Sequence, residues 1–400
     1  MKIGIMLQSF DESMAGIGVY TQEIVRALLR VDSTNEYLLI YPGFGDARKH
    51  RGEFRRYRNV TEIETYFPRL PFNADSSRLP AWVPRLLKKM RALAPVETYW
   101  DQVVVPRVLK QYGVDVVFNP HLTVPIRGRC GKVMILHNVE YHLIPNVYNW
   151  RMYTWWFLLE HAIMPAADRV ISLSHAMTAD FRKYVNYPIA QVRTIYHGVS
   201  EKFRVETDPA RLARARQEYG LPDRFLLFVG RLYPQKNFVT LARAFAQVKD
   251  TIPHRLIVAG QPRYKFAGEL NILGELGIEG RVDFLRHVPN DDLPLLYNLA
   301  DCCVYPSLYE SFGLVQLEAM ACGCPVLGAN SGAIPEIAGG AALLFEPKDA
   351  EQLAEAIRRI VSDRELRQSY VEKGLRRAHE FTWERCARET LQVLQEVAAS

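Results

Sequence analysis

Short apolar runs alternate with helical patterns along most of the chain, and this alternation limits the folds open to it. Apolar runs bounded by turn residues are typical of strands that are buried on both faces of a parallel sheet. The runs that we interpret as strands are residues 2–7, 37–41, 114–118, 132–136, 169–173, 225–229, 255–260, 282–285 and 302–305. Their alternation with helices predicts the α/β class, with doubly wound sheets.

The chain has 400 residues, of which 48% are hydrophobic and 24% are charged. This composition is ordinary for a globular protein, but the length exceeds what one hydrophobic core usually serves. We therefore expect two domains, residues 1–200 and 201–382, followed by a helix over 383–400. No run of about 20 apolar residues occurs, which argues against a membrane-spanning helix.

The predicted strand at 302–305 leads into a polar loop and then into a helical pattern. Ser311 is a plausible N-cap of that helix. The free N–H groups of Phe312, Gly313 and Leu314, together with the positive end of the helix dipole, would then favour an anion such as a diphosphate. Gly313 would let the anion approach the backbone closely.

Two carboxylates bracket this stretch: Glu310 precedes the predicted helix and Glu318 lies inside it. Such a pair could hold hydroxyl groups on either side of a diphosphate. A diphosphate with hydroxyl groups on both sides has the shape of a nucleotide sugar. The simpler interpretation is that both glutamates are solvated surface residues, as ionised side chains normally are.

A second candidate anion site follows the predicted strand at 225–229. Gly230 and Arg231 come first, and Lys236 and Asn237 follow after a short turn. The spacing does not fit a Walker A loop, which needs glycine directly before the lysine. Arginine offers a bidentate fork and lysine a movable charge, so the pair could neutralise one diphosphate.

Gly16 and Gly18 stand in a predicted loop before a helix over about 19–30. A strand, a glycine loop and a helix in this order can place a phosphate at a helix N-terminus. The third glycine of a dinucleotide-binding fingerprint is absent, because position 21 is threonine. A plain tight turn is therefore an equally good interpretation.

Two successive predicted strands deliver a histidine to the same edge of the first sheet. His121 follows the strand at 114–118, and His137 with Asn138 follows the strand at 132–136. A single histidine is more often a structural residue than a functional one. His121 and Asn138 are candidates for the acceptor side of a site.

The stretch from Glu310 to Glu318 resembles the Glu-seven-residues-Glu signature of retaining glycosyltransferases of family 4 (glycosyl transferases group 1). Gly230-Arg231 and Lys236-Asn237 are similar to the phosphate clamp of that family. The resemblance implies the GT-B fold, with two doubly wound Rossmann-like domains facing a deep cleft. It also implies that the helix at 383–400 crosses back to the first domain.

The resemblance further implies individual roles. Glu310 would lie by the donor sugar, and Glu318 would hold the ribose hydroxyls. His137 would lie near the hydroxymethyl side of the sugar, and the Gly16 loop would lie against the diphosphate. Val288 resembles the turn that meets the nucleobase in relatives, with their usual glycine replaced. The sequence departs from the family pattern at Val315, at Gln316 and at His197, which replaces an asparagine.

The activity implied is metal-independent transfer of a hexose, of mannose or glucose type, from a GDP- or UDP-linked donor. The acceptor would be a hydroxyl group, as on a lipid-linked glycan or polysaccharide precursor, and the anomeric configuration would be retained. Glu310, His137, Arg231 and Lys236 would form the catalytic set, with no cofactor. A non-catalytic sugar-nucleotide-binding protein is one alternative, and a dinucleotide-dependent oxidoreductase is another.

The net charge of +6 is unevenly distributed. Residues 48–110 contain 14 Lys and Arg against 6 Asp and Glu, interleaved with the aromatic residues Phe67, Phe72, Trp82, Tyr99 and Trp100. This combination suits an anionic membrane surface or a lipid-phosphate acceptor. A solvated helix face with a loop is the alternative, and we find no nucleic-acid-binding motif.

None of the six cysteines has the paired spacing of a zinc site, which favours reduced structural thiols. The first apolar run is too short for a signal peptide. We therefore expect a cytoplasmic protein, with the inner face of the membrane as a second location.

Overall fold

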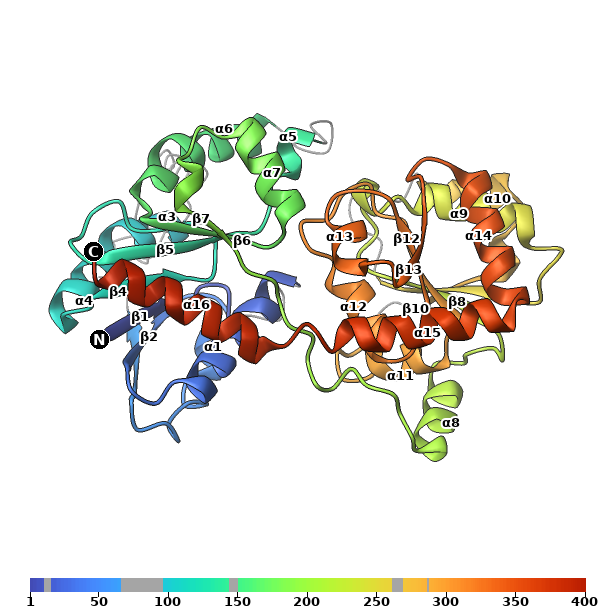
Figure 1. The fold of residues 1–400 in the computed structure, drawn as a ribbon, viewed down its shortest axis with the longest axis horizontal. Helices are drawn as coiled ribbons and strands as arrows, with labels where there is room; N and C mark the ends of the chain where they lie inside the picture. The colour runs from blue at the N-terminus through green and yellow to red at the C-terminus, as the bar shows by residue number, and fades with distance from the viewer. Residues whose placement is uncertain (11–15, 66–95, 144–149, 261–268, 286–287) are drawn as a thin grey trace, which may run out of the picture.

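The computed structural model describes residues 1–10, 16–65, 96–143, 150–260, 269–285 and 288–400. Two parallel sheets with helices packed against them lie side by side, and the chain passes between them twice (Figure 1). This is the two-domain α/β architecture that the sequence predicted. Part of the predicted basic and aromatic region, including Phe67, Phe72 and Trp82, lies outside the described residues.

The first sheet has seven strands among the described residues, in the order β3-β2-β1-β4-β5-β6-β7. They are β1 (Lys2–Met6), β2 (Glu36–Pro42), β3 (Val60–Thr65), β4 (Val116–Asn119), β5 (Gly131–Leu136), β6 (Arg169–Ser172) and β7 (Val192–Thr194). The strand order reverses direction between β1 and β4, which pair in parallel with Ile3 opposite Val116. In doubly wound sheets, ligands bind at the carboxyl ends of strands at such a switch point.

The second sheet has six strands in the described part of the chain, in the order β10-β9-β8-β11-β12-β13. They are β8 (Phe225–Val229), β9 (Arg255–Ala259), β10 (Val282–Leu285), β11 (Cys302–Tyr305), β12 (Val326–Ala329) and β13 (Ala342–Phe345). Its switch point lies between β8 and β11. The predicted strands did not include β3, β7, β12 or β13.

The main helices of the first domain are α1 (Gly16–Val31), α3 (Val96–Tyr99), α4 (Val105–Tyr112), α5 (Glu140–Leu143), α6 (Trp150–Leu158) and α7 (His175–Tyr184). A π-helical turn, η5 (Trp100–Val104), joins α3 to α4. Those of the second domain are α8 (Pro209–Glu218), α9 (Phe238–Val248), α10 (Ile272–Glu275), α11 (Leu293–Leu299), α12 (Leu314–Ala321), α13 (Ile334–Ala338), α14 (Ala350–Ser362) and α15 (Arg364–Ala378). None of the helices that the structure describes is long and apolar enough to cross a lipid bilayer.

The last helix, α16 (Trp383–Ala398), returns to the first domain and packs on α1 and β5 (Figure 1). Thr382 caps it by accepting a hydrogen bond from the N–H of Arg385. The packing on β5 is close, because a Cβ atom added to Gly131 would lie 2.4 Å from the side chain of Val397.

The two chain crossings between the domains touch each other. The N–H of Val199 donates to the carbonyl of Phe381 at 3.1 Å. A Cβ atom on Gly198 would lie 2.2 Å from the backbone nitrogen of Trp383, so only glycine fits there. The domains are therefore joined at a tight backbone crossing.

Three sequence predictions are corrected by the structure. Gly16 and Gly18 belong to the first turn of α1 rather than to a loop. Ser311 is not the N-cap of α12, because the helix begins at Leu314 and Gly313 occupies the cap position with φ 101°. Trp100 is fully buried and donates from Nε1 to Thr65 Oγ1 at 2.6 Å, so it cannot face a membrane.

Candidate functional site

The loop between β11 and α12, residues 306–313, is held in place by the loop that follows β8. Asn237 Nδ2 donates to the carbonyl of Pro306 at 2.9 Å. The N–H of Leu308 donates to the carbonyl of Gln235 at 2.8 Å, and Gln235 Nε2 donates to the carbonyl of Tyr309 at 2.9 Å. These two loops, which lie at the switch point of the second sheet, therefore behave as one unit.

The turn after β12 fixes the same loop from its other side. The N–H of Ala333 donates to the carbonyl of Glu310 at 2.9 Å. Gly332 has φ +53°, and a Cβ atom there would lie 2.7 Å from the Glu310 carbonyl oxygen. The backbone on both sides of Glu310 is thus set by its neighbours, which orients the carboxylate.

Lys236 and Glu310 meet in an ion pair, with 2.5 Å between Nζ and Oε1. Their side chains are only 21% and 13% exposed. The Lys236 ammonium also lies 5.7 Å from the centre of the Tyr305 ring. The structure therefore brings together Lys236 and Glu310, two of the four residues in the predicted catalytic set.

Tyr305 interacts with both glutamates and was not found from the sequence. Burial, followed by the charge of Glu310, raises the pKa of its hydroxyl well above the usual value, and Glu318 adds to the effect. Tyr305 ends a strand that reads as ordinary core, so only its position at the strand end distinguished it.

Glu318 lies in the second turn of α12, where Tyr297 donates a hydrogen bond to it at 3.2 Å. Burial raises the pKa of its carboxyl to about 7. At neutral pH the group is therefore close to half ionised, and an additional hydrogen-bond donor would stabilise its charged form.

Gly230 and Arg231 directly follow β8, beside β11 in the sheet. Gly230 has φ +143°, and a Cβ atom there would lie 4.0 Å from Lys236 Cε. Arg231 is half-buried. Val288 is also half-buried and follows β10 at the outer edge of the sheet. Arg231 is thus placed at the same sheet edge as the Lys236–Glu310 pair.

The start of α12 presents backbone N–H groups next to this pair. Phe312 and Gly313 are buried, and Leu314 is half-buried. Gly313 has φ 101°, a conformation that favours glycine, and a Cβ atom there would lie 2.9 Å from Gln316 Nε2. The amide of Gln316 is fully buried, and neither of its polar atoms has a hydrogen-bond partner within the described part of the chain.

The predicted first-domain residues lie at the carboxyl ends of β4 and β5. His137 is buried, and its Nε2 lies 2.9 Å from the carbonyl oxygen of Pro120. Burial lowers the pKa of His137 to about 4, and burial with the charge of His137 lowers the pKa of His121 to about 3. Both rings are therefore neutral at neutral pH. Asn138 is half-buried beside them.

Ring contacts connect His137 to the loop that carries Glu310. The ring centres of Phe312 and His197 are 4.6 Å apart, those of His197 and Tyr20 are 4.5 Å apart, and those of Tyr20 and His137 are 5.3 Å apart. Tyr20 lies one turn beyond Gly16 in α1, so these two positions share a face of the helix. The carboxyl edge of the first sheet therefore faces residues 306–313, which the sequence predicts to hold the donor and which we call the donor loop.

Hydrogen bonds also cross directly between the domains. Ser174 Oγ donates to the carbonyl of Ser311 at 2.8 Å. Glu336 accepts from the N–H groups of His175 and Ala176 at 2.8 and 2.7 Å, at the N-terminus of α7. Tyr309 donates to Asp180 at 2.9 Å. The donor loop is thus in contact with the first domain.

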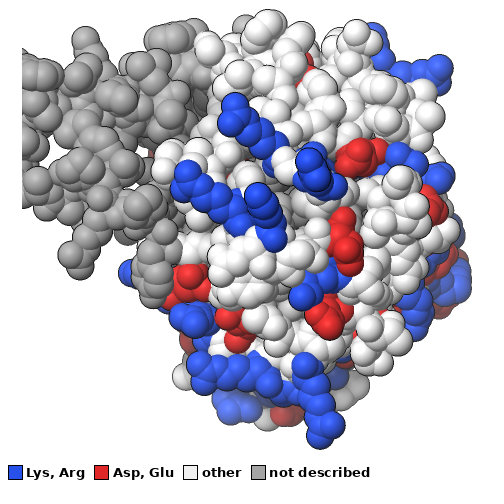
Figure 2. Space-filling view, turned by 90° about the vertical axis from the view of Figure 1, so that its left-hand side faces the viewer, with Lys and Arg blue, Asp and Glu red and all other residues white. Residues whose placement is uncertain are grey.

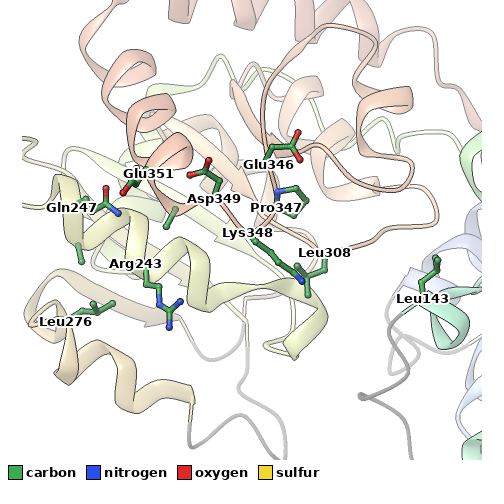
Figure 3. Close-up of a pocket in the computed structure, with 12 residues that line it drawn as sticks. Leu143, Arg243, Gln247, Leu276, Leu308, Glu346, Pro347, Lys348, Asp349 and Glu351 are labelled. Carbon is green, nitrogen blue, oxygen red and sulfur yellow. The ribbon is translucent and has the colours of Figure 1, made fainter.

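A cavity of about 1210 Å³ adjoins Leu308 of the loop at 306–313 (Figure 3). It is lined by Arg243 of α9, Lys348 before α14, Leu308 and, across from them, Leu143. None of the predicted donor residues lines it. It is therefore a separate feature, although Leu308 adjoins both.

Solved structures share this fold over the whole chain. Sucrose-phosphate synthase from Thermosynechococcus elongatus aligns with a TM-score of 0.72 and 24% identity, covering 100% of both chains. The Anabaena protein HepE, solved with UDP and glucose, aligns with a TM-score of 0.72 and 22% identity, covering 99% of this chain and 100% of that one. These likenesses define the fold as GT-B.

Family models cover most of the sequence. The model for Glycosyltransferase Family 4 matches residues 14–203, and the model for Glycosyl transferases group 1 matches residues 212–377. O-antigen chain mannosyltransferase B of Escherichia coli is 26% identical over 402 residues, covering 98% of each chain. D-inositol 3-phosphate glycosyltransferase of Corynebacterium jeikeium is 33% identical over 242 residues, 58% of each chain. The chain belongs to the group 1 glycosyltransferases of family 4 type and is a glycosyltransferase.

Proposed function

We propose that this enzyme transfers a hexose from a nucleotide diphosphate sugar to a hydroxyl group of a glycan acceptor, with retention of the anomeric configuration. The observation that supports it most is the Lys236–Glu310 pair beside the start of α12. A cation, a carboxylate and free backbone N–H groups in one place match the diphosphate and the sugar hydroxyls of such a donor.

In this proposal the donor exchanges partners with the protein as it binds. Lys236 turns from Glu310 to the diphosphate, which Arg231 and the N–H groups of Phe312, Gly313 and Leu314 also contact. Glu310 then accepts hydrogen bonds from the sugar hydroxyls, and Glu318 accepts from the ribose. The Gly16 and Gly18 turn lies against the diphosphate from the first domain, Ser311 borders the sugar, and Val288 meets the base.

The chemical step follows a front-face route. The acceptor oxygen forms a bond to the anomeric carbon on the face from which the diphosphate leaves, and the bond from that carbon to the phosphate oxygen breaks. The proton of the acceptor hydroxyl passes to the leaving phosphate. Positive groups arranged in advance around the diphosphate stabilise its developing charge, so the proposal requires no metal. His137 holds the sugar as a neutral hydrogen-bonding ring.

The relatives narrow the proposed substrates. One is named as an O-antigen chain mannosyltransferase, and a structural neighbour was solved with UDP-glucose. We therefore propose a GDP- or UDP-linked hexose of mannose or glucose type and an acceptor in polysaccharide synthesis, with a lipid-linked precursor as the specific case. Asn138 and His121 border the acceptor.

We further propose that the first domain meets an anionic membrane surface at the cytoplasmic side. Arg48, Lys49, Arg55 and Arg56 are exposed around η2 (Ala47–His50) and the turn that follows it. Figure 2 shows Lys and Arg side chains gathered on one end of the molecule. Sedimentation with vesicles containing anionic lipid tests this: binding should fall in R55E/R56E and with added salt, and unchanged binding would contradict it.

A direct test uses a panel of radiolabelled UDP, GDP and ADP sugars. One donor should stabilise the protein against heating and transfer its sugar to a glycan acceptor, whereas Glu310→Gln should bind the nucleotide but transfer nothing. Glu365→Gln, an exposed residue of α15, serves as the matched control. A protein that binds a donor and neither transfers nor hydrolyses it would instead be the non-catalytic sugar-nucleotide-binding protein.

A further inference from the structure

A cluster of buried polar side chains lies at the switch point of the first sheet, and the proposed chemistry does not use it. Gln8 and Ser9 follow β1, and Asn119 and Thr123 lie at the end of β4 and just after it. Asp101 reaches the same place from the π-helical turn η5. We refer to these five residues as the switch-point cluster.

Asp101 is the centre of the cluster. It is 2% exposed and accepts a hydrogen bond from Thr123 Oγ1 at 2.6 Å. Gln8 Nε2 lies 3.4 Å from both Asp101 Oδ1 and Thr123 Oγ1. Asn119 Nδ2 donates to the carbonyl of Thr123 at 2.6 Å and to its Oγ1 at 3.0 Å. The hydroxyl hydrogen and the amide groups of the cluster are directed at acceptors within it.

Several polar atoms of this region have no hydrogen-bond partner among the residues that the structure describes. They are Gln8 Oε1, Ser9 Oγ, Asn119 Oδ1 and the adjoining His121 Nδ1, all buried. The orientation of the Asn119 amide is fixed, because the Thr123 carbonyl can only accept hydrogen bonds. The unsatisfied oxygen of Asn119 is therefore an acceptor.

Buried acceptors without donors are unfavourable in a purely structural network. A ligand that brings O–H groups would satisfy them, whereas a phosphate would bring more acceptors and a negative charge beside Asp101. The cluster itself contains no lysine or arginine that would offset that charge.

The cluster also lies at the carboxyl edge of the first sheet, where ligands bind in doubly wound sheets. The ring centres of His121 and His137 are 6.5 Å apart, and His137 is connected through Tyr20 and His197 to Phe312 of the donor loop. Ring contacts therefore run from this edge of the first sheet to the donor loop of the second domain.

We propose that the switch-point cluster binds the hydroxyl groups of a neutral acceptor sugar and disfavours a phosphorylated acceptor. This rests on the proposed glycosyltransfer and specifies its acceptor class. The proposed acceptor differs from the phosphorylated compound in the name of one relative, D-inositol 3-phosphate glycosyltransferase. Asp101, Asn119 and Gln8 act as binding residues for that sugar.

The test measures acceptor binding in the presence of the nucleotide diphosphate by saturation-transfer NMR. The probes are methyl α-D-mannopyranoside, methyl α-D-glucopyranoside, their 6-phosphates and D-inositol 3-phosphate. At least one neutral glycoside should bind at least about tenfold more tightly than every phosphorylated probe. Buried polar groups that lack a partner discriminate strongly between ligands that satisfy them and ligands that do not. Tighter binding of a phosphorylated probe, or no binding of either neutral glycoside, would overturn the proposal.

Variants assign the effect to the cluster. Asp101→Asn should raise the acceptor KM about tenfold and leave nucleotide affinity unchanged, because one carboxyl oxygen that can accept a hydrogen bond is replaced by an amide nitrogen that only donates. Gln8 is a half-buried loop residue, and Gln8→Leu should also raise the acceptor KM. It serves as the second variant if Asp101→Asn proves unstable. An unchanged acceptor KM in a folded variant of each would refute the assignment. Loss of nucleotide binding in the wild-type protein would instead contradict the proposed function itself.

Discussion

The two switch points of this molecule have the same topology and opposite chemistry. At β8 and β11 the loops present Arg231, Lys236 and the N–H groups at the start of α12, which are positive or hydrogen-donating. At β1 and β4 the loops present buried oxygen atoms around Asp101. One doubly wound sheet is thus suited to an anion and the other to hydroxyl groups, and the difference lies in the loops rather than in the strands.

The largest effect should come from removing the carboxylate at the positive switch point. We expect Glu310→Ala to lower kcat by about 10³-fold, since an oriented charged group beside the reacting carbon is lost. The measurement is steady-state transfer of labelled sugar, with Glu365→Ala as the control. Turnover within a few-fold of wild type would remove Glu310 from the site.

Removing the cation should have the next largest effect. Lys236→Gln should lower kcat/KM about 100-fold, because the leaving diphosphate loses a positive partner. The loss should be accompanied by weaker binding of the nucleotide diphosphate in calorimetry. If Lys236 only neutralised Glu310, nucleotide affinity would stay the same, and the two switch points would no longer differ as described.

A smaller effect is expected from replacing Glu336, which connects the two domains. The Glu336 carboxylate accepts hydrogen bonds from two backbone N–H groups at the start of α7 and, at 2.8 Å, from the hydroxyl group of Tyr196. Glu336→Ala should lower kcat/KM about tenfold, because hydrogen bonds to a charged group that hold the domains together are lost. The radius of gyration from small-angle scattering should rise in parallel. A change in activity without a change in shape would argue against this clasp.

The smallest effect is a pH dependence of donor binding. Burial raises the pKa of Glu318 to about 7, and the carboxylate form is the one that accepts hydroxyl hydrogen bonds. Donor affinity should therefore fall several-fold as the pH drops from about 8 to about 6. Calorimetry with the nucleotide sugar would show this in the wild type but not in Glu318→Gln, and a persisting dependence in the variant would place the titration elsewhere.

The raised pKa of Glu318 also affects stability. The folded protein keeps a proton on Glu318 that the unfolded chain loses above the ordinary glutamate pKa of 4.5. The contribution of this group to stability is therefore largest at low pH and declines as the pH rises from about 4.5 to about 7. Chemical unfolding of wild type and Glu318→Gln across that range would separate this contribution from the rest.

The sequence was sufficient to predict the fold class and most of the central strands, because buried parallel strands appear as apolar runs. The edge strands β3, β7 and β13 and the interior strand β12 were missed, since their apolar character is interrupted or shared with neighbouring segments. The start of α12 was placed too early. Ser311 looks like a cap locally, but its carbonyl instead accepts a hydrogen bond from Ser174 of the other domain.

Lys236 and Glu310 could be singled out from the sequence because each stands in a motif of known spacing, Arg231 with Lys236 and Glu310 with Glu318. Tyr305 could not be found, because it differs from core tyrosines only by its interaction with two carboxylates. The switch-point cluster was also missed. Asp101, Asn119 and Gln8 come from distant segments, and only the folded sheet brings them together.

The most direct test of the central claim is a crystal structure with an intact nucleotide diphosphate sugar. The diphosphate is predicted to lie within hydrogen-bonding distance of Lys236 Nζ and the N–H groups at the start of α12, with Glu310 on the sugar hydroxyls. A donor bound instead in the cavity between Arg243 and Lys348, with the Lys236–Glu310 pair intact, would contradict the account.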